Sequence, residues 1–128
     1  MELNSNPVGW FEIPVSDMER AVKFYETVFS FNLERQNFGG FEMAWFPYAD
    51  KPGAPGSLVH DEKFYKPSQD GVLIYFSSPS GDLKNELDKV ESAGGKVLMQ
   101  KKNISEEIGF MGMISDTEGN RIALHSKK

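Results

Sequence analysis

The sequence predicts an α+β fold in which two βαβββ modules form a curved mixed sheet, a half-open barrel around a central cleft, with one helix outside each module. Two observations predict this fold. The order of one strand, one helix and three strands occurs twice in 128 residues. Corresponding positions also keep nearly the same separation, since Trp10 precedes Val72 by almost as many residues as Met18 precedes Leu83. We therefore expect a single domain over residues 1–128.

The first module, over about residues 7–60, is expected to open with a strand. Residues 8–15 are rich in β-formers and are followed by Ser16-Asp17, either of which can cap a helix. Apolar residues then recur at helical spacing as far as Phe29. Turn-forming residues separate three further extended segments, which are 32–37, 41–46 and 56–60.

The second module, over about residues 71–126, repeats this order after a linker at 61–70. A strand is expected at 71–76, and Ser80 is expected to cap a helix that Gly94-Gly95 ends. Three strands then follow, with a tight turn before the last of them, at 96–101, 110–115 and 121–126.

Composition excludes several classes of function. Lys and Arg number 14 against 19 Asp and Glu, a net charge of -5, which disfavours a nucleic-acid partner. No apolar run approaches the ~20 residues that span a bilayer, and residues 1–6 lack the features of a signal peptide. The sequence has no cysteine, which excludes disulfides, thiolate zinc sites and cysteine nucleophiles. We expect a cytoplasmic protein without a membrane partner.

Three segments carry a family resemblance. They are residues 13–25 with Phe29, the Gly94-Gly95-Lys96-Val97 segment after the second helix, and residues 116–122 before the last strand. In this order they resemble the vicinal oxygen chelate superfamily of glyoxalases, bleomycin-resistance proteins and extradiol dioxygenases. The resemblance covers nearly the whole chain and implies a glyoxalase-like domain made of the two modules.

The same resemblance bears on metal binding, because metal-dependent members hold a divalent metal with side chains that are mostly His and Glu. The four ligand positions fall here on Trp10, Val72, Ala123 and one of three residues at a strand end, Leu58, Val59 or His60. At least three of these side chains offer no lone pair, whereas such a site needs three or four N or O donors. We expect the inherited site to hold no metal, and we expect no other cofactor.

Glu12 is the leading candidate for chemistry. Strand alternation places Glu12 on the same face as Trp10, so its carboxylate is expected to look into the cleft beside an apolar wall. There it could act as a general base or bind a cationic ligand group. An alternative is that Glu12 pairs with Arg121, which shares a face with Ala123. The two roles are compatible.

The two histidines leave a second alternative open. His60 ends one predicted strand, and His125 shares the face of Arg121 near the end of another. Together with Glu12 they could rebuild a displaced two-His, one-carboxylate metal site. The candidate ligand-binding residues are therefore Trp10, Glu12, His60, Val72, Arg121, Ala123 and His125.

The sequence supports two main classes of function. The first is a glyoxalase/bleomycin-resistance-like protein without the family's metal ligands, which binds a small apolar or aromatic molecule, with or without a cationic group. The second is a glyoxalase-like lyase or isomerase that uses Glu12 as a general base, with or without a rebuilt metal site. A purely structural or interaction module is a third reading. A homodimer is expected, since an aromatic-rich double sheet gains from covering its edges.

Overall fold

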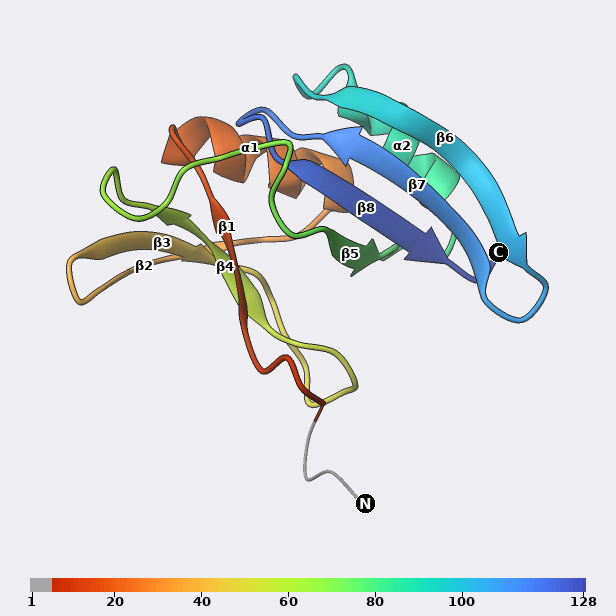
Figure 1. Cartoon of the computed structure of the whole chain (residues 1–128), viewed down its shortest axis with the longest axis horizontal. Helices are drawn as coiled ribbons and strands as arrows, with labels where there is room; N and C mark the ends of the chain where they lie inside the picture. The colour runs from red at the N-terminus through yellow and green to blue at the C-terminus, as the bar shows by residue number, and fades with distance from the viewer. Residues whose placement is uncertain (1–5) are drawn as a thin grey trace.

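The structure, a computed structural model, describes residues 6–128 apart from the side chain of Phe38. The prediction that the first residues lack a targeting signal falls largely on 1–5, which lie outside the described residues. Within the described range, two helices and eight strands follow the predicted order (Figure 1). The α+β fold of two βαβββ modules is confirmed.

The first sheet has the strand order β1-β4-β3-β2. Strand β1 (Phe11–Pro14) runs parallel to β4 (Gly56–His60), and β4 is antiparallel to β3 (Phe41–Trp45). Strand β2 (Glu34–Phe38) completes the sheet at its far edge. Helix α1 (Met18–Phe29) crosses over between β1 and β2 and contacts β3 and β4.

The second sheet has the equivalent order β5-β8-β7-β6. Strand β5 (Ile74–Ser77) runs parallel to β8 (Arg121–Ser126), with β7 (Gly109–Ser115) and β6 (Lys96–Ser105) beyond it. Helix α2 (Leu83–Val90) packs on this sheet and against α1. Figure 1 shows both helices behind the sheets. Strand pairing stays within each module, so the two sheets remain unclosed.

The helix caps agree with the sequence in one module and differ in the other. Asp17 caps α1, and its Oδ1 accepts a hydrogen bond from the backbone N–H of Arg20 at 3.1 Å. The prediction that Ser80 caps α2 is wrong, because Asp82 is the residue directly before the first helical turn. Asp82 Oδ1 accepts a hydrogen bond from the backbone N–H of Lys84 at 3.0 Å.

Three strands, β1, β2 and β5, begin later than predicted, and β1 and β5 do so for a common reason. β1 begins at Phe11 because its partner β4 begins at Gly56, directly after a Pro-rich loop that offers no strand to pair with residues 8–10. For β5, which begins at Ile74, residues 71 and 72 would face 119 and 120, which fall in the turn before β8. These unpaired segments are free to line cavities between the modules.

An aromatic core joins the two modules under the helices. The ring of Phe76 lies 4.8 Å from that of Phe29 and 5.2 Å from that of Phe46, centroid to centroid. Tyr25, which is fully buried, contacts the same three rings. Since these residues come from α1, the loop after β3 and β5, the core holds both sheets against one helical layer.

Glu118, in the turn before β8, ties the second module to the start of α1. Its Oε1 accepts hydrogen bonds from the backbone N–H groups of Ser16 and Asp17 at 2.9 and 2.8 Å. The Arg20 side chain donates two more hydrogen bonds to Glu118, from its Nε to Oε2 at 2.7 Å and from its Nη2 to Oε1 at 2.9 Å. Two of the segments that carry the family resemblance therefore contact each other directly.

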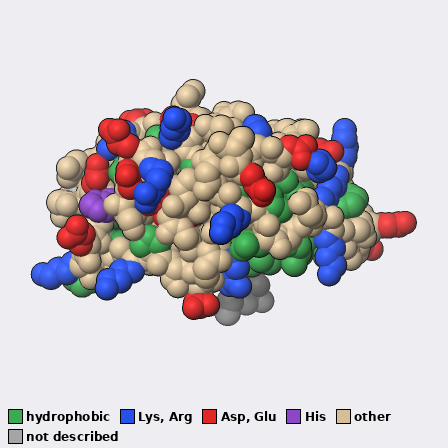
Figure 2. All heavy atoms as spheres, turned by 90° about the horizontal axis from the view of Figure 1, so that it is seen from above, with side chains coloured by type: hydrophobic (Ala, Val, Ile, Leu, Met, Phe, Trp, Pro, Cys, Tyr) green, Lys and Arg blue, Asp and Glu red, His purple; other side chains and the backbone are tan. Residues whose placement is uncertain are grey.

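The surface mixes charges of both signs. Figure 2 shows Lys and Arg side chains interspersed with Asp and Glu over the face that it views. Among the described residues, no helix is both long and apolar enough to cross a membrane.

Candidate functional site

A cavity of about 240 Å³ lies between β1, the connection that leads from β4 to β5, and the start of β8. We call it the Glu12 cavity. Its walls mix apolar and charged side chains, and the residues used below are Glu12, Pro14, Lys66, Val72, Ile74 and Arg121. The structure thus brings together three of the predicted ligand-binding residues, Glu12, Val72 and Arg121.

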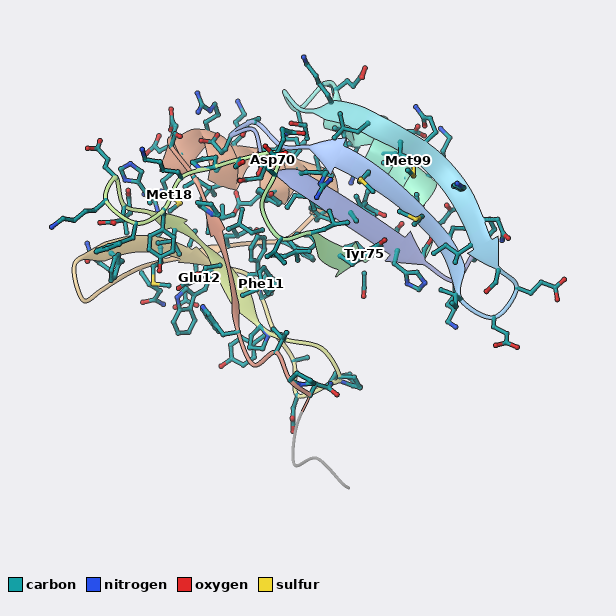
Figure 3. The ribbon with its side chains drawn as sticks, viewed as in Figure 1. Phe11, Glu12, Met18, Asp70, Tyr75 and Met99 are labelled. Carbon is teal, nitrogen blue, oxygen red and sulfur yellow. The ribbon has the colours of Figure 1, made fainter. Side chains whose placement is uncertain are left out.

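Glu12 faces this cavity because strand β1 alternates its side chains. Ile13 is buried in the core, and Phe11 packs against other core rings, so Glu12 must point to the opposite face. Figure 3 shows Phe11 and Glu12 on opposite sides of β1. The predicted orientation of Glu12 follows from this alternation.

Two aromatic side chains hold the Glu12 carboxylate. The Tyr65 hydroxyl donates to Oε1 at 2.6 Å, and Trp10 Nε1 donates to Oε2 at 3.3 Å. This hydrogen bond to Glu12, with desolvation and the Glu12 charge adding to it, raises the pKa of Tyr65 to about 12. Tyr65 lies in the predicted linker, and no pattern in the sequence placed it on Glu12.

The predicted ion pair between Glu12 and Arg121 is wrong for the described residues. The salt bridges of the described chain do not include it, because Tyr65 and Trp10 occupy the carboxylate instead. Arg121 Nε is buried and has no hydrogen-bond partner within the described part of the chain. A buried N–H without an acceptor costs about 1–3 kcal/mol.

Further aromatic rings support the residues around Glu12. Trp10 packs edge-on against Trp45 with ring centroids 5.1 Å apart, and Phe41 packs in the same way against Tyr65 at 5.7 Å. These contacts fix the two donors that hold Glu12. Val72, by contrast, is 91% exposed, so it forms the open rim of the cavity and no inner wall.

The remaining candidates lie outside the cavity. His60 Nδ1 is 3.4 Å from Glu42 Oε1, and His125 Nε2 donates to the backbone carbonyl of Ile108 at 2.5 Å. Ala123 is fully buried in the second sheet. None of these three is among the residues that line the Glu12 cavity.

The rebuilt metal site is not assembled. Over residues 6–128, no three side chains among His, Cys, Asp and Glu lie together so that they could hold a metal ion. The structure therefore does not bring Glu12, His60 and His125 to one point. That alternative from the sequence is wrong for the described chain.

Comparison with known proteins settles the family. A family model of the Glyoxalase/Bleomycin resistance protein/Dioxygenase superfamily matches residues 8–124. The chain belongs to this superfamily. A glyoxylase-like domain-containing protein from Didymella fabae is 29% identical over 124 residues, which cover 91% of each chain.

Two solved structures of the superfamily's fold illustrate the likeness. A glyoxalase I mutant from Zea mays matches with a TM-score of 0.72 and 21% identity, over 94% of this chain and 47% of that one. The chain thus spans about half the length of the maize enzyme. TnmS3, an antibiotic-binding protein from Streptomyces, matches with a TM-score of 0.66 and 26% identity, over 99% of this chain and 100% of that one.

Proposed function

We propose that this member of the superfamily binds a small molecule with an apolar ring in the Glu12 cavity without a metal ion. The observation that carries the proposal is the buried Arg121 Nε, which has no acceptor among the described residues and belongs to a side chain that lines the cavity. The ligand is therefore expected to carry an acceptor group, such as a carboxylate, toward Arg121. The printed description of TnmS3 as an antibiotic-binding protein supports binding as a role for this fold.

The charges of the cavity favour an anionic ligand group. Lys66 and Arg121 supply two cations against the single carboxylate of Glu12. Both Glu12 oxygens already accept hydrogen bonds from Tyr65 and Trp10, which further reduces the pull of Glu12 on a cation. The structure thus favours an anionic group over the cationic one that the sequence left open.

The walls and the volume limit the rest of the ligand. Pro14 and Ile74 present apolar surface inside the cavity, and Val72 does so at its rim. A volume of about 240 Å³ is below the ~300–1,000 Å³ of sites for drug-sized ligands. A single substituted ring is the size that fits.

Independence from metal is supported by the side chains at the positions that the family resemblance assigns to metal ligands. Trp10 donates its indole N–H to Glu12, Val72 is exposed at the rim, and Ala123 is buried. None of the three has a lone pair for a metal ion.

The alternative function is that of a lyase or isomerase in which Glu12 moves a proton. One observation favours it, namely that Tyr65 and Trp10 hold the Glu12 carboxylate in one orientation at the cavity wall. Fixed placement is what a general base needs. Glu12→Gln separates the two functions, because a binding protein keeps its affinity while an enzyme loses turnover.

We also propose a homodimer and a cytoplasmic location. Large apolar side chains stay exposed on the single chain, among them Val72, Tyr75 and Leu98, at 91%, 49% and 48%. The outer strands β2 and β6 each leave an edge without a partner strand in the described chain. A sedimentation mass near 14.4 kDa at micromolar concentration would contradict the dimer. The absence of cysteine supports the cytoplasm.

A titration with benzoate tests binding in the Glu12 cavity. Benzoate is a single ring with one carboxylate, and benzamide is its neutral control. We expect benzoate to shift the backbone amide signals of Gly71 and Val72 in the NMR spectrum, and Arg121→Gln to weaken its binding about 10-fold or more. Equal binding of benzoate by Arg121→Gln would contradict the proposed role of Arg121.

A further inference from the structure

A second cavity, of about 310 Å³, lies between β5 and the loop that joins β3 to β4. We call it the loop cavity. It shares no lining residue with the Glu12 cavity. In Figure 3, Phe11 projects from β1 on the side of β5, where Tyr75 lies. The two cavities therefore use different residues of β1, and one can be altered without the other.

The floor of the loop cavity is a cluster of tightly packed aromatic rings. Phe46 and Phe76 are 6% and 7% exposed, with ring centroids 5.2 Å apart. Phe11 lies 5.8 Å from the first of these rings and 5.9 Å from the second. Each ring is held by its neighbours, so a flat ligand would meet a surface that is already ordered.

The rim carries two aromatic rings that are open to solvent. Tyr48 and Tyr75 line the same cavity and are 70% and 49% exposed. Large rings exposed at the mouth of an aromatic cavity can stack on a bound ligand, at about 0.5–1.5 kcal/mol for each pair of rings. The cavity therefore offers aromatic contact on more than one side.

The loop that closes the cavity is preformed. Pro47, Pro52 and Pro55 line it and restrict the backbone of the loop. Gly53 has a φ of 114°, which other residues adopt only with strain, and a Cβ on Gly56 would lie 2.4 Å from the Phe11 ring. The loop thus reaches its close packing on Phe11 through glycine, and little entropy remains to be lost on binding.

Lys51 gives the loop cavity its charge preference. Among the described residues that line it, Lys51 is the one charged side chain. We propose that the loop cavity binds a planar fused-ring aromatic anion, with its rings against the exposed rings of Tyr48 and Tyr75 and the anionic group toward Lys51. This second site is independent of the function proposed for the Glu12 cavity.

The probe for this site is 2-naphthoate, with neutral 2-naphthamide as its control. Backbone amides report where each probe binds. We expect 2-naphthoate to shift the signals of Gly53, Ala54 and Gly56 in a concentration-dependent way. The proposal would be overturned if the amide signals of the loop did not shift at millimolar 2-naphthoate. It would also be overturned if only the signals of Gly71 and Val72, in the other cavity, shifted.

Two exposed positions provide the variants. Lys51→Gln should weaken 2-naphthoate about 2- to 5-fold and leave 2-naphthamide unchanged, since a solvated charge pair contributes modestly. Tyr48→Ala should weaken both probes about 3- to 10-fold through lost stacking. Equal affinities of 2-naphthoate for wild type and both variants would overturn the assigned roles.

Arg121→Gln is the matched control from the other cavity. It should leave the response of Gly53, Ala54 and Gly56 to 2-naphthoate as it is in the wild type. If Arg121→Gln abolished that response, the loop cavity would not be an independent site and the inference would fail. Loss of benzoate binding with an intact loop response would leave this inference standing, whatever the outcome for the Glu12 cavity.

Discussion

The hydroxyl of Tyr25 on α1 donates a hydrogen bond to Oδ2 of Asp116 at 2.7 Å, which joins the helix of the first module to the last turn of the second. Asp116 also accepts from the backbone N–H groups of Glu118 and Asn120, both at 2.8 Å, and from Asn120 Nδ2 at 3.0 Å. Burial, together with the Asp116 charge, raises the pKa of Tyr25 well above its usual value. One buried carboxylate therefore organises the contact between the modules.

Substitutions at this contact should destabilise the fold in graded steps. Tyr25→Phe removes one donor and should lower the free energy of unfolding by about 1–2 kcal/mol. Asp116→Ala leaves several buried donors without an acceptor and should cost about 3 kcal/mol or more. Urea denaturation measures both values. Tyr48→Phe, at an exposed tyrosine, is the matched control and should change stability by less than about 0.5 kcal/mol.

Glu118 should make stability depend on acid pH. Burial acts to raise its pKa, but hydrogen bonds from Arg20, the Asp17 and Ser16 backbone and Thr117 together lower it from 4.5 to about 2. Because the folded pKa lies below the unfolded one, this stability is present above about pH 5 and is lost as pH falls from roughly 4 to 2.

The test compares wild type with Glu118→Gln across that range of pH. The variant should be less stable at neutral pH by up to about 2 kcal/mol, and the difference should shrink toward pH 2. A difference in unfolding free energy that stays constant from pH 7 to pH 2 would show that the Glu118 charge is not responsible.

Tyr65 should report on the Glu12 carboxylate. With Glu12 in place its pKa is about 12, so the phenol should stay protonated at pH 11. In Glu12→Gln the charge and the charged acceptor are lost, and Tyr65 should titrate near the ordinary ~10. The ζ-carbon NMR signal of Tyr65 measures this directly.

Glu12→Gln should otherwise be mild. Arg121 does not pair with Glu12 in the described chain, so the substitution does not take a partner away from a buried cation. The free energy of unfolding should therefore change by about 1 kcal/mol at most. Benzoate should bind at least as tightly, since a negative charge has been removed from the cavity. A loss of about 3 kcal/mol in stability would mean that Glu12 offsets a buried arginine after all.

Much of the fold could be predicted because it depends on local patterns. Strands 56–60 and 121–126 are confirmed to the residue, and Asp17, one of the two residues predicted as possible caps, caps its helix. The ends of β1 and β5 could not be predicted, because each depends on where a partner strand begins far away in the sequence. The periodicity of hydrophobic residues along a strand does not show where its partner strand begins.

The candidate site was predictable only where strand alternation decides it. Alternation predicts that Glu12 faces the cleft and that Arg121 shares a face with Ala123, and the family resemblance implies a site position at Val72. Glu12, Val72 and Arg121 all line the Glu12 cavity. The hydrogen bond from Tyr65 to Glu12 could not be predicted. Tyr65 lies in the segment that connects β4 to β5, and the path of that segment is not encoded in a local pattern. The loop cavity was missed for a similar reason, since its rings come from four separate segments.

One titration tests directly whether a small molecule binds in the Glu12 cavity without a metal ion. Benzoate binding is measured by NMR on protein purified without added metal, before and after dialysis against EDTA, with elemental analysis of both samples. We expect far less than one transition-metal ion per chain and the same dissociation constant for benzoate in both samples. A stoichiometric metal ion whose removal abolishes benzoate binding would contradict this expectation.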